Sequence, residues 1–266
     1  MALRLQPAPK KLKVEARNEK EFGTAFPCQP AVVQSNKVPF PCVTCKVREL
    51  AFCCVLNDAE IERFRDILTR VRLSPRQTLF DEAEEATHAF NVTEGTLKLF
   101  KLLPDGRRQV IGFLNPGDFI GLADVREYSC SAEAITETLL CRFPRKKLEI
   151  LLKKFPKLEA RFFDMARNEL SEAHQKMLLL GRMTAKERIA SFLLMLSDRA
   201  ACRGQPRNPI AIPMSRNDIG DFLGLTIETV SRTLTRLKGT GVISVEENRK
   251  IIVNDQNLLE EIAGRI

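Results

Sequence analysis

Residues 215–232 read SRNDIGDFLGLTIETVSR, and this stretch decides the fold of the C-terminal part of the chain. Ser215 is a good N-cap for a short helix over residues 216–223, whose first turn carries an acidic residue. A glycine-containing turn follows, and Thr226 caps a second helix over residues 227–238. Two short helices joined by such a turn form a helix-turn-helix.

The residues after the second helix predict a β-hairpin. Two apolar runs, at 241–245 and 251–253, are separated by a polar turn at 246–249. A helix-turn-helix followed by a hairpin is a winged helix. Because another helix begins with a capping box at Thr184, we predict a winged helix-turn-helix DNA-binding domain over residues 184–266.

The second helix of this motif carries side chains suited to reading bases. Glu228, Ser231 and Arg232 are spaced i, i+3 and i+4, so they share one face. Arg can bind guanine O6 and N7, and Glu can accept from cytosine N4. The alternative is that Glu228 and Arg232 form an ordinary surface ion pair. We expect contacts to the DNA backbone from four further side chains: Thr229, Thr233, Arg236 and Lys238.

Composition adds little to the DNA prediction. The net charge is +8, but residues 184–266 hold 12 Lys and Arg against 10 Asp and Glu. An anionic partner is therefore allowed but not identified. The chain has no run of 18 uncharged apolar residues, and residues 1–20 lack the apolar core of a secretory signal. We expect a cytoplasmic protein that does not enter a membrane.

The middle of the chain alternates short apolar runs with turns. Asn57 and Glu60 predict the start of a helix. Short strands at this spacing, joined by Gly and Pro turns, predict a compact β-sandwich or β-roll. The whole chain is then of the α+β class, with a sensor domain over residues 58–150. The predicted strands lie within residues 77–80, 89–92, 96–100, 109–114 and 131–143.

A long amphipathic helix is predicted over residues 151–183. Six apolar side chains recur along it at alternating spacings of three and four, which is the a/d pattern of a coiled coil. A second apolar face includes Leu158, Phe162 and Met165. Two faces suggest two partners, so we predict a homodimer; the alternative is one buried helix in a monomer. The predicted dimer seam consists of Phe163, Ala166, Leu170, Ala173, Met177 and Leu180.

The cysteines cluster near the N-terminus. Five of the eight lie between residues 28 and 54. In a chain of this size that we place in the cytoplasm, metal binding or redox chemistry is a better explanation than disulfides. Cys42 and Cys45 form a CxxC pair, and Cys53 follows after seven residues. We assign residues 1–57 to an irregular tail and this cysteine-bearing loop.

The stretch from Ser215 to Arg232 closely resembles the recognition motif of the Crp–Fnr superfamily. The spacing of Cys42, Cys45 and Cys53 is similar to that of its fumarate and nitrate reduction regulator branch, of the alphaproteobacterial FnrN and FnrL type. The resemblance covers about residues 42–266. It implies a β-roll like a cyclic-nucleotide-binding domain, a dimerisation helix and a winged helix, in that order.

The resemblance also implies a site and a target. The family's base-reading triplet falls on Glu228, Ser231 and Arg232, and its target is a palindrome with TTGAT-like half-sites, one per subunit. Its fourth cluster ligand falls on Cys141 and not on Cys130. Four thiolates suit one [4Fe–4S] cluster per subunit, whereas spacing alone is equally consistent with zinc. Cys54 could replace Cys53, and the remaining cysteines, Cys28, Cys130 and Cys202, are expected to be free thiols or small apolar residues.

No cyclic nucleotide is expected. Segments 117–123 and 128–132 match the nucleotide-binding region of relatives that hold cyclic AMP, but they contain no phosphate-binding Arg. No arrangement of residues suggests an enzyme. The resemblance implies an oxygen-responsive transcription regulator that acts with RNA polymerase, as an activator of anaerobic or microaerobic genes. A zinc-stabilised or metal-free DNA-binding regulator that does not sense oxygen is the alternative.

Overall fold

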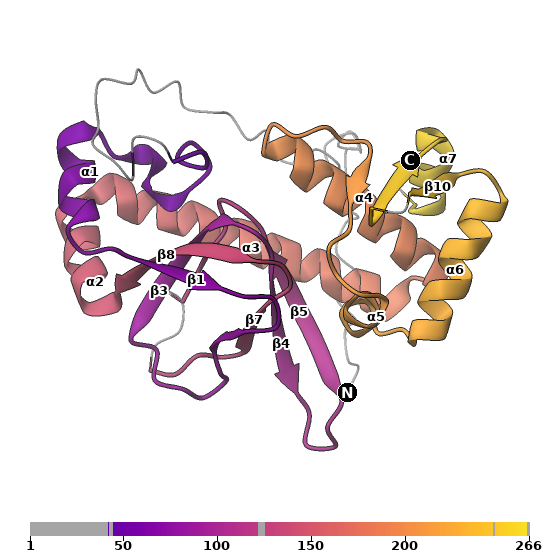
Figure 1. The fold of residues 1–266 in the computed structure, drawn as a ribbon, viewed down its shortest axis with the longest axis horizontal. Helices are drawn as coiled ribbons and strands as arrows, with labels where there is room; N and C mark the ends of the chain where they lie inside the picture. The colour runs from indigo at the N-terminus through magenta and orange to yellow at the C-terminus, as the bar shows by residue number, and fades with distance from the viewer. Residues whose placement is uncertain (1–41, 43–44, 122–125, 247, 265–266) are drawn as a thin grey trace, which may run out of the picture.

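The computed structural model describes residues 42, 45–121, 126–246 and 248–264. The predicted N-terminal tail, with Cys28, lies outside the described residues. So do residues 43–44, between Cys42 and Cys45, and residues 122–125, within the segment that was compared with cyclic-AMP-binding relatives. Figure 1 shows a β-rich half on the side of α1 and α2, a long helix α3 running behind its strands, and a helical half around α6. No helix of the described residues is long and apolar enough to cross a membrane.

The first half is a β-roll of two four-stranded sheets. One sheet has the strand order β1-β8-β3-β6 and the other β2-β7-β4-β5. Buried side chains of both sheets meet in one core, where the rings of Phe80 and Tyr128 stack with centroids 3.7 Å apart. The strands are β1 (Thr69–Leu73), β2 (Thr78–Phe80), β3 (His88–Glu94), β4 (Leu97–Leu102), β5 (Arg108–Leu114), β6 (Phe119–Ile120), β7 (Ser131–Ala134) and β8 (Thr138–Pro144).

Helices cover one end of the roll. The 3-10 helix η1 (Phe52–Val55) leads to α1 (Asp58–Arg65), where Asn57 and Glu60 form the predicted capping box. After the last strand come α2 (Arg145–Lys154) and α3 (Pro156–Arg182). The predicted domain boundary at residue 150 falls inside α2. The chain leaves the helix only at Phe155, because a residue before proline is disfavoured in the α conformation.

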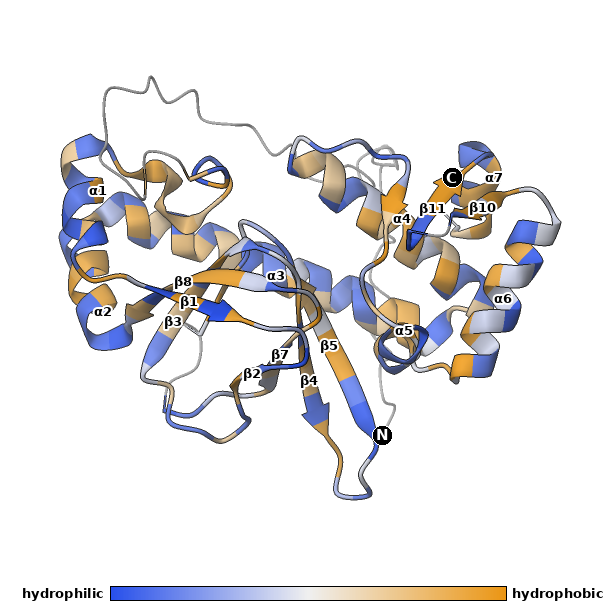
Figure 2. Ribbon diagram, in the orientation of Figure 1, coloured by the Kyte–Doolittle hydropathy of each residue, from blue (hydrophilic) through white to orange (hydrophobic). Residues whose placement is uncertain are grey.

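Helix α3 carries two apolar faces, and Figure 2 shows hydrophobic and hydrophilic residues alternating along it. Leu158 is fully buried, and Phe162 and Met165 pack against the same core, beside η1 and α1. The seam predicted for dimerisation lies on a neighbouring face of the helix, and most of it stays in solvent, whereas Leu180 at its end is half-buried. Phe163, Leu170 and Met177 keep 59%, 59% and 67% of their surface exposed.

The second half is a winged helix, as predicted. Its fold class is confirmed, and α5 and α6 begin at the predicted caps, Ser215 and Thr226. Two features were not predicted: β9 adds a third strand to the wing, and a further helix, α7, follows it. The elements are α4 (Ala185–Cys202), β9 (Ile210–Ala211), α5 (Arg216–Leu223), α6 (Ile227–Gly239), β10 (Ile243–Glu246), β11 (Lys250–Val253) and α7 (Gln256–Ile262).

The two halves share a hydrophobic core. Phe100, Val110 and Phe113, on β4 and β5 of the roll, are buried in the same cluster as the core of the winged helix. The ring of Phe113 lies 6.2 Å from that of Phe192 and 5.2 Å from that of Phe222, measured between centroids. The winged helix is therefore packed against the roll.

Candidate metal centre and DNA interface

The four cysteines predicted as ligands line one pocket. Cys42 and Cys45 come from the loop before η1, Cys53 from η1 and Cys141 from β8, almost ninety residues further along the chain. Cys42, Cys53 and Cys141 also pack against the aromatic core at this end of the roll. The fold thus brings together thiols that are far apart in sequence.

Strand pairing places Cys141 between two polar residues. Cys141 lies opposite Arg70 on β1 and opposite Asn91 on β3. Directly paired residues of antiparallel strands point to the same face of a sheet. The sheet therefore presents a thiol, a guanidinium and an amide side by side beneath the cysteine loop.

The pocket wall is largely aromatic, but two of its polar groups have unused bonding capacity. Phe52, Phe64 and Phe143 line it, together with Arg48 and Asn91. Arg48 bonds Asp58 through Nη2 at 3.2 Å, yet its Nε is buried without a hydrogen-bond partner among the described residues. Asn91 Oδ1 is likewise buried, and it has no partner in the part of the chain that the structure describes. Buried polar groups are rarely left unsatisfied, so these atoms are consistent with a further group in the pocket.

Burial controls the acidity of the thiols. Burial, and then the neighbouring thiols Cys45 and Cys42, raise the pKa of Cys141 to about 12, although Arg70 acts against them. The same causes, with Cys141 added, raise the pKa of Cys53 still further. At neutral pH these groups stay protonated without a metal, and a metal would bind with release of their protons.

The donor set of four thiols suits either zinc or an iron–sulfur cluster. Among the residues that the structure describes, no three His, Cys, Asp or Glu side chains are grouped closely enough to hold one metal ion. Zinc would require four sulfurs about 2.3 Å from a single point, and a [4Fe–4S] cluster would take four thiolates around a larger body. The positive charge of Arg48 and Arg70 would suit anionic thiolates in either case.

The other described cysteines lie outside this pocket. Cys54 follows Cys53 in η1 but is buried and does not line the pocket. The geometry therefore favours Cys53 as the third ligand. Cys130 is buried in the roll, and Cys202 is exposed at the end of α4.

The predicted recognition surface is formed locally by the two helices. Gly224 adopts a left-handed conformation between them, with φ of 64°. A Cβ on Gly220 would come within 2.6 Å of the carbonyl oxygen of Leu225, so the close approach of the two helices requires glycine there. These constraints place α6 across α5 with one face outward.

The base-reading triplet lies together on that outward face. Glu228, Ser231 and Arg232 line one open surface depression with Ile227. The carboxylate of Glu228 accepts from its own backbone amide and from Thr226, and these bonds lower its pKa, with a smaller effect of Arg232. Of the predicted backbone contacts, Arg236 and Lys238 are exposed and Thr229 and Thr233 are half-buried. Contact with DNA remains a prediction for all seven residues.

Comparison with known proteins identifies the family. Residues 187–262 match the Crp-like helix-turn-helix domain, and residues 70–155 match the cyclic nucleotide-binding domain. The transcriptional activatory protein AadR of Rhodopseudomonas palustris is 45% identical over 207 residues, which cover 77% of this chain and 87% of AadR. The chain belongs to the Crp–Fnr family.

Other Crp–Fnr regulators are also similar to this chain over most of its length. The transcriptional activator protein FnrL of Cereibacter sphaeroides is 36% identical over 227 residues, which cover 84% of this chain and 92% of FnrL. The solved structure of FixK2 from Bradyrhizobium japonicum superposes with a TM-score of 0.69 at 36% identity, over 74% of this chain and 97% of FixK2. The chain is thus a DNA-binding Crp–Fnr transcription regulator, and the relatives are regulators rather than enzymes.

The sequence did not point to two polar residues that line the pocket, Arg48 and Asn91, or to Arg70, which is paired with Cys141 beside it. Arg48 lies within the cysteine loop, and its position beside a CxxC pair was a signal that could have drawn attention to it. Arg70 and Asn91 had no such signal, because only the pairing of β1 and β3 with β8 brings them to Cys141.

In the interior of the roll, the stacked rings of Phe80 and Tyr128 occupy the core. The expectation that the protein binds no cyclic nucleotide remains a prediction.

Proposed function

We propose that this Crp–Fnr regulator is oxygen-responsive. In this proposal it holds one [4Fe–4S] cluster on Cys42, Cys45, Cys53 and Cys141, and it binds a TTGAT-like palindrome as a homodimer when the cluster is intact. The observation that carries the proposal is the convergence of these four thiols in one aromatic pocket. The names of the relatives say nothing about a cluster, so the proposal depends on the pocket.

The cluster would supply a redox-active iron–sulfur centre that oxygen can attack. The chain supplies the connection between this centre and the dimer helix. Arg161, on α3, donates from Nη2 to the carbonyl oxygen of Leu50 at 3.3 Å, within the cysteine loop. Leu158 of the same helix is fully buried beside η1. A change in the conformation of the cysteine loop would therefore alter the position of α3 at the start of the seam.

The exposed seam supports dimerisation. Phe163, Leu170 and Met177 form a stripe on α3 that no described residue of the chain covers. An apolar stripe of this kind marks a protein interface, and the a/d spacing fits a second copy of the same helix. A two-fold dimer would present two α6 helices to the two halves of a palindrome. Activation of anaerobic or microaerobic genes would then proceed through RNA polymerase.

The test is the iron and acid-labile sulfide content of protein purified without oxygen, with its visible spectrum, sedimentation and DNA affinity recorded before and after exposure to air. We expect about four irons and four sulfides per subunit, and loss of colour, dimer and DNA binding in air. Intact DNA binding and dimerisation after complete loss of the cluster would overturn the oxygen response.

A metal-free or zinc-stabilised regulator is the second candidate. Cys53 and Cys141 pack against the buried aromatic core, where neutral thiols are stable without a metal, and zinc could instead be held by the same four thiols. Protein of this kind would contain zinc or no metal, and its DNA affinity would be the same before and after exposure to air.

A further inference from the structure

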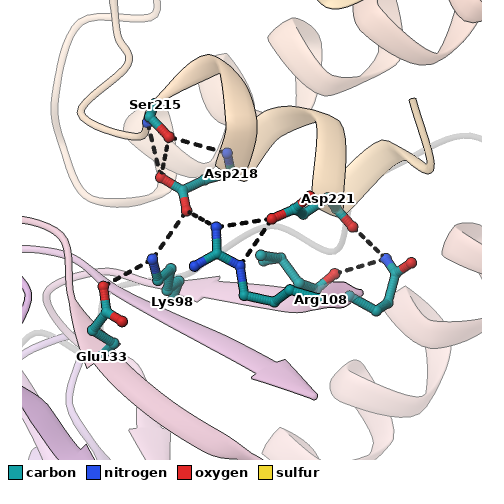
Figure 3. A network of polar contacts seen from close by, with 8 residues as sticks. Lys98, Arg108, Glu133, Ser215, Asp218 and Asp221 are labelled. Atoms are coloured by element: carbon teal, nitrogen blue, oxygen red, sulfur yellow. Dashed lines mark hydrogen bonds and ion pairs between the residues drawn. The ribbon is translucent and has the colours of Figure 1, made fainter. Parts of the chain in front are cut away.

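A buried lysine joins the roll to the helix-turn-helix. Lys98, on β4, is only 5% exposed. Its Nζ lies 2.8 Å from Glu133 Oε1, on the neighbouring strand β7, and 3.0 Å from Asp218 Oδ1, in the first turn of α5. Figure 3 shows Lys98 between these two carboxylates. A buried charge is tolerated only when it is paired, so this contact is specific.

Arg108 makes a second connection from the next strand. Its Nη2 lies 3.1 Å from Asp218 Oδ1, and its Nε donates to Asp221 Oδ2 at 2.8 Å (Figure 3). Gln109 donates to the backbone carbonyl oxygen of Asp221 at 2.6 Å. The β4–β5 hairpin thus holds α5 at two successive turns.

Asp218 also belongs to the cap of α5. Its Oδ2 accepts from the backbone amide of Ser215 at 3.1 Å and from the Ser215 hydroxyl at 2.5 Å, while Oδ1 receives Lys98 and Arg108. The start of α5 is therefore fixed to the hairpin through a residue that also caps the N-terminus of this helix. Since α5 and α6 are joined by the constrained turn at Gly224, fixing α5 also fixes α6.

The winged helix needs such a contact, because the chain leaves the helical conformation between α3 and α4. Met183 has φ of −86° and ψ of 145°, and Thr184 has φ of −70° and ψ of 164°, both extended. A junction of this kind does not by itself define the angle between two helices. The orientation of α6 relative to the seam of α3 must come from contacts across the junction.

We infer that Lys98 and Arg108 are positioning residues for DNA recognition: by clamping α5 they set the distance and angle between the two α6 helices of a dimer. Half-sites of a palindrome lie about 34 Å apart, one turn of DNA, so both recognition helices must be held at that spacing. Neither residue lies on the recognition surface of α6. This inference rests on the proposed binding of a palindrome by a homodimer.

The experiment uses full-length protein reconstituted without oxygen, with Arg108→Gln, Lys98→Met and the double variant. The control is Lys101→Met, a change on the same hairpin that removes the exposed ion pair between Lys101 and Glu82. Affinity is measured for one palindrome, for versions with one or two base pairs inserted or removed at its centre, and for a single half-site. Arg108 is partly exposed, so its variant is expected to fold even where the loss of Lys98 disturbs the fold.

We expect the wild type and Lys101→Met to prefer one spacing. The Lys98 and Arg108 variants should lose about tenfold in affinity for that spacing and discriminate less between the altered spacings, because a less firmly held second domain has a lower effective concentration at one fixed spacing. Their affinity for a single half-site should stay within about twofold of the wild type, which also reports that α5 and α6 are folded.

An Arg108→Gln variant that keeps the wild-type spacing profile would overturn the inference, as would a parallel loss of affinity for the half-site and for all palindromes. A wild type that binds a palindrome no better than a half-site would instead overturn the proposed dimeric function, and this inference with it.

Discussion

Leu170 gives the most direct test of the dimer seam. It lies in the middle of the seam and keeps 59% of its surface exposed in the single chain. Positions of an a/d seam meet their own counterparts across a parallel two-fold dimer, so the change Leu170→Glu would place two carboxylates opposite each other. The proposed dimer should be weakened, while the fold of the chain, to which this exposed side chain contributes little, should persist.

The size of the effect follows from the remaining exposure. Full burial of a leucine side chain is worth about 1.5–3 kcal/mol, and Leu170 has 59% of its surface still to bury. Two copies per dimer then contribute about 2–4 kcal/mol, before any repulsion between the carboxylates. Since 1.4 kcal/mol is a factor of ten, the dissociation constant of the dimer should rise about 30-fold to 1,000-fold.

The assay is sedimentation velocity over a concentration series, on protein reconstituted without oxygen. The matched control is Gln175→Glu, which adds the same charge at an exposed position of α3 on the side opposite the seam. We expect the control to dimerise as the wild type does. A dimer of Leu170→Glu with an unchanged dissociation constant would refute the seam, and α3 would then have to be explained as a helix of a monomer.

Three further predictions concern DNA reading, the cysteine pocket and the junction of the two halves. Arg232→Ala should weaken binding to the palindrome about 10–100-fold, whereas Lys238→Ala should weaken binding to every sequence alike and lower the salt dependence of log K by about one; gel-shift titrations in which Arg232→Ala discriminates between bases as the wild type does would contradict its role. The Cys53→Ser variant should lose iron and sulfide on reconstitution while Cys54→Ser keeps them, because Cys53 lines the pocket and Cys54 does not. The opposite result would assign the third ligand to Cys54. Burial, with a smaller effect of Arg199, lowers the pKa of Lys176 from 10.5 to about 8. Between these two pH values the unfolded state holds a proton that the folded state has lost. The free energy of unfolding of the wild type should therefore rise with pH relative to that of Lys176→Met. A difference between the two proteins that does not change with pH would contradict this.

Local signals in the sequence were enough to define the winged helix. Ser215 and Thr226 cap the helices in the structure as they do in the prediction, because a cap is a contact between residues three positions apart. Strand β1 was not predicted, because its five residues contain only two apolar side chains, although these alternate with Arg70 and Arg72 as in a half-buried strand. The two-residue strands β6 and β9 are too short to show any period.

The site was predictable only where a pattern or a resemblance reached it. The clustering of cysteines near the N-terminus by itself indicated metal binding or redox chemistry, but Cys141 entered through the resemblance to the family, since no local pattern connects it to the loop. The contact between Lys98 and Asp218 spans 120 residues. Neither residue carries a local sign of its partner, because such a contact depends on how two separately folded halves are packed.

The shared core of the two halves has a consequence for synthesis on the ribosome. Phe100, Val110 and Phe113 are buried in a cluster that the winged helix completes. At about 5–20 residues per second, translation leaves these side chains uncovered for roughly ten seconds before α6 has been made. During that time the nascent roll presents an exposed apolar patch that chaperones could bind. A chain cut before α4 would retain this patch permanently, and we expect it to aggregate when expressed alone.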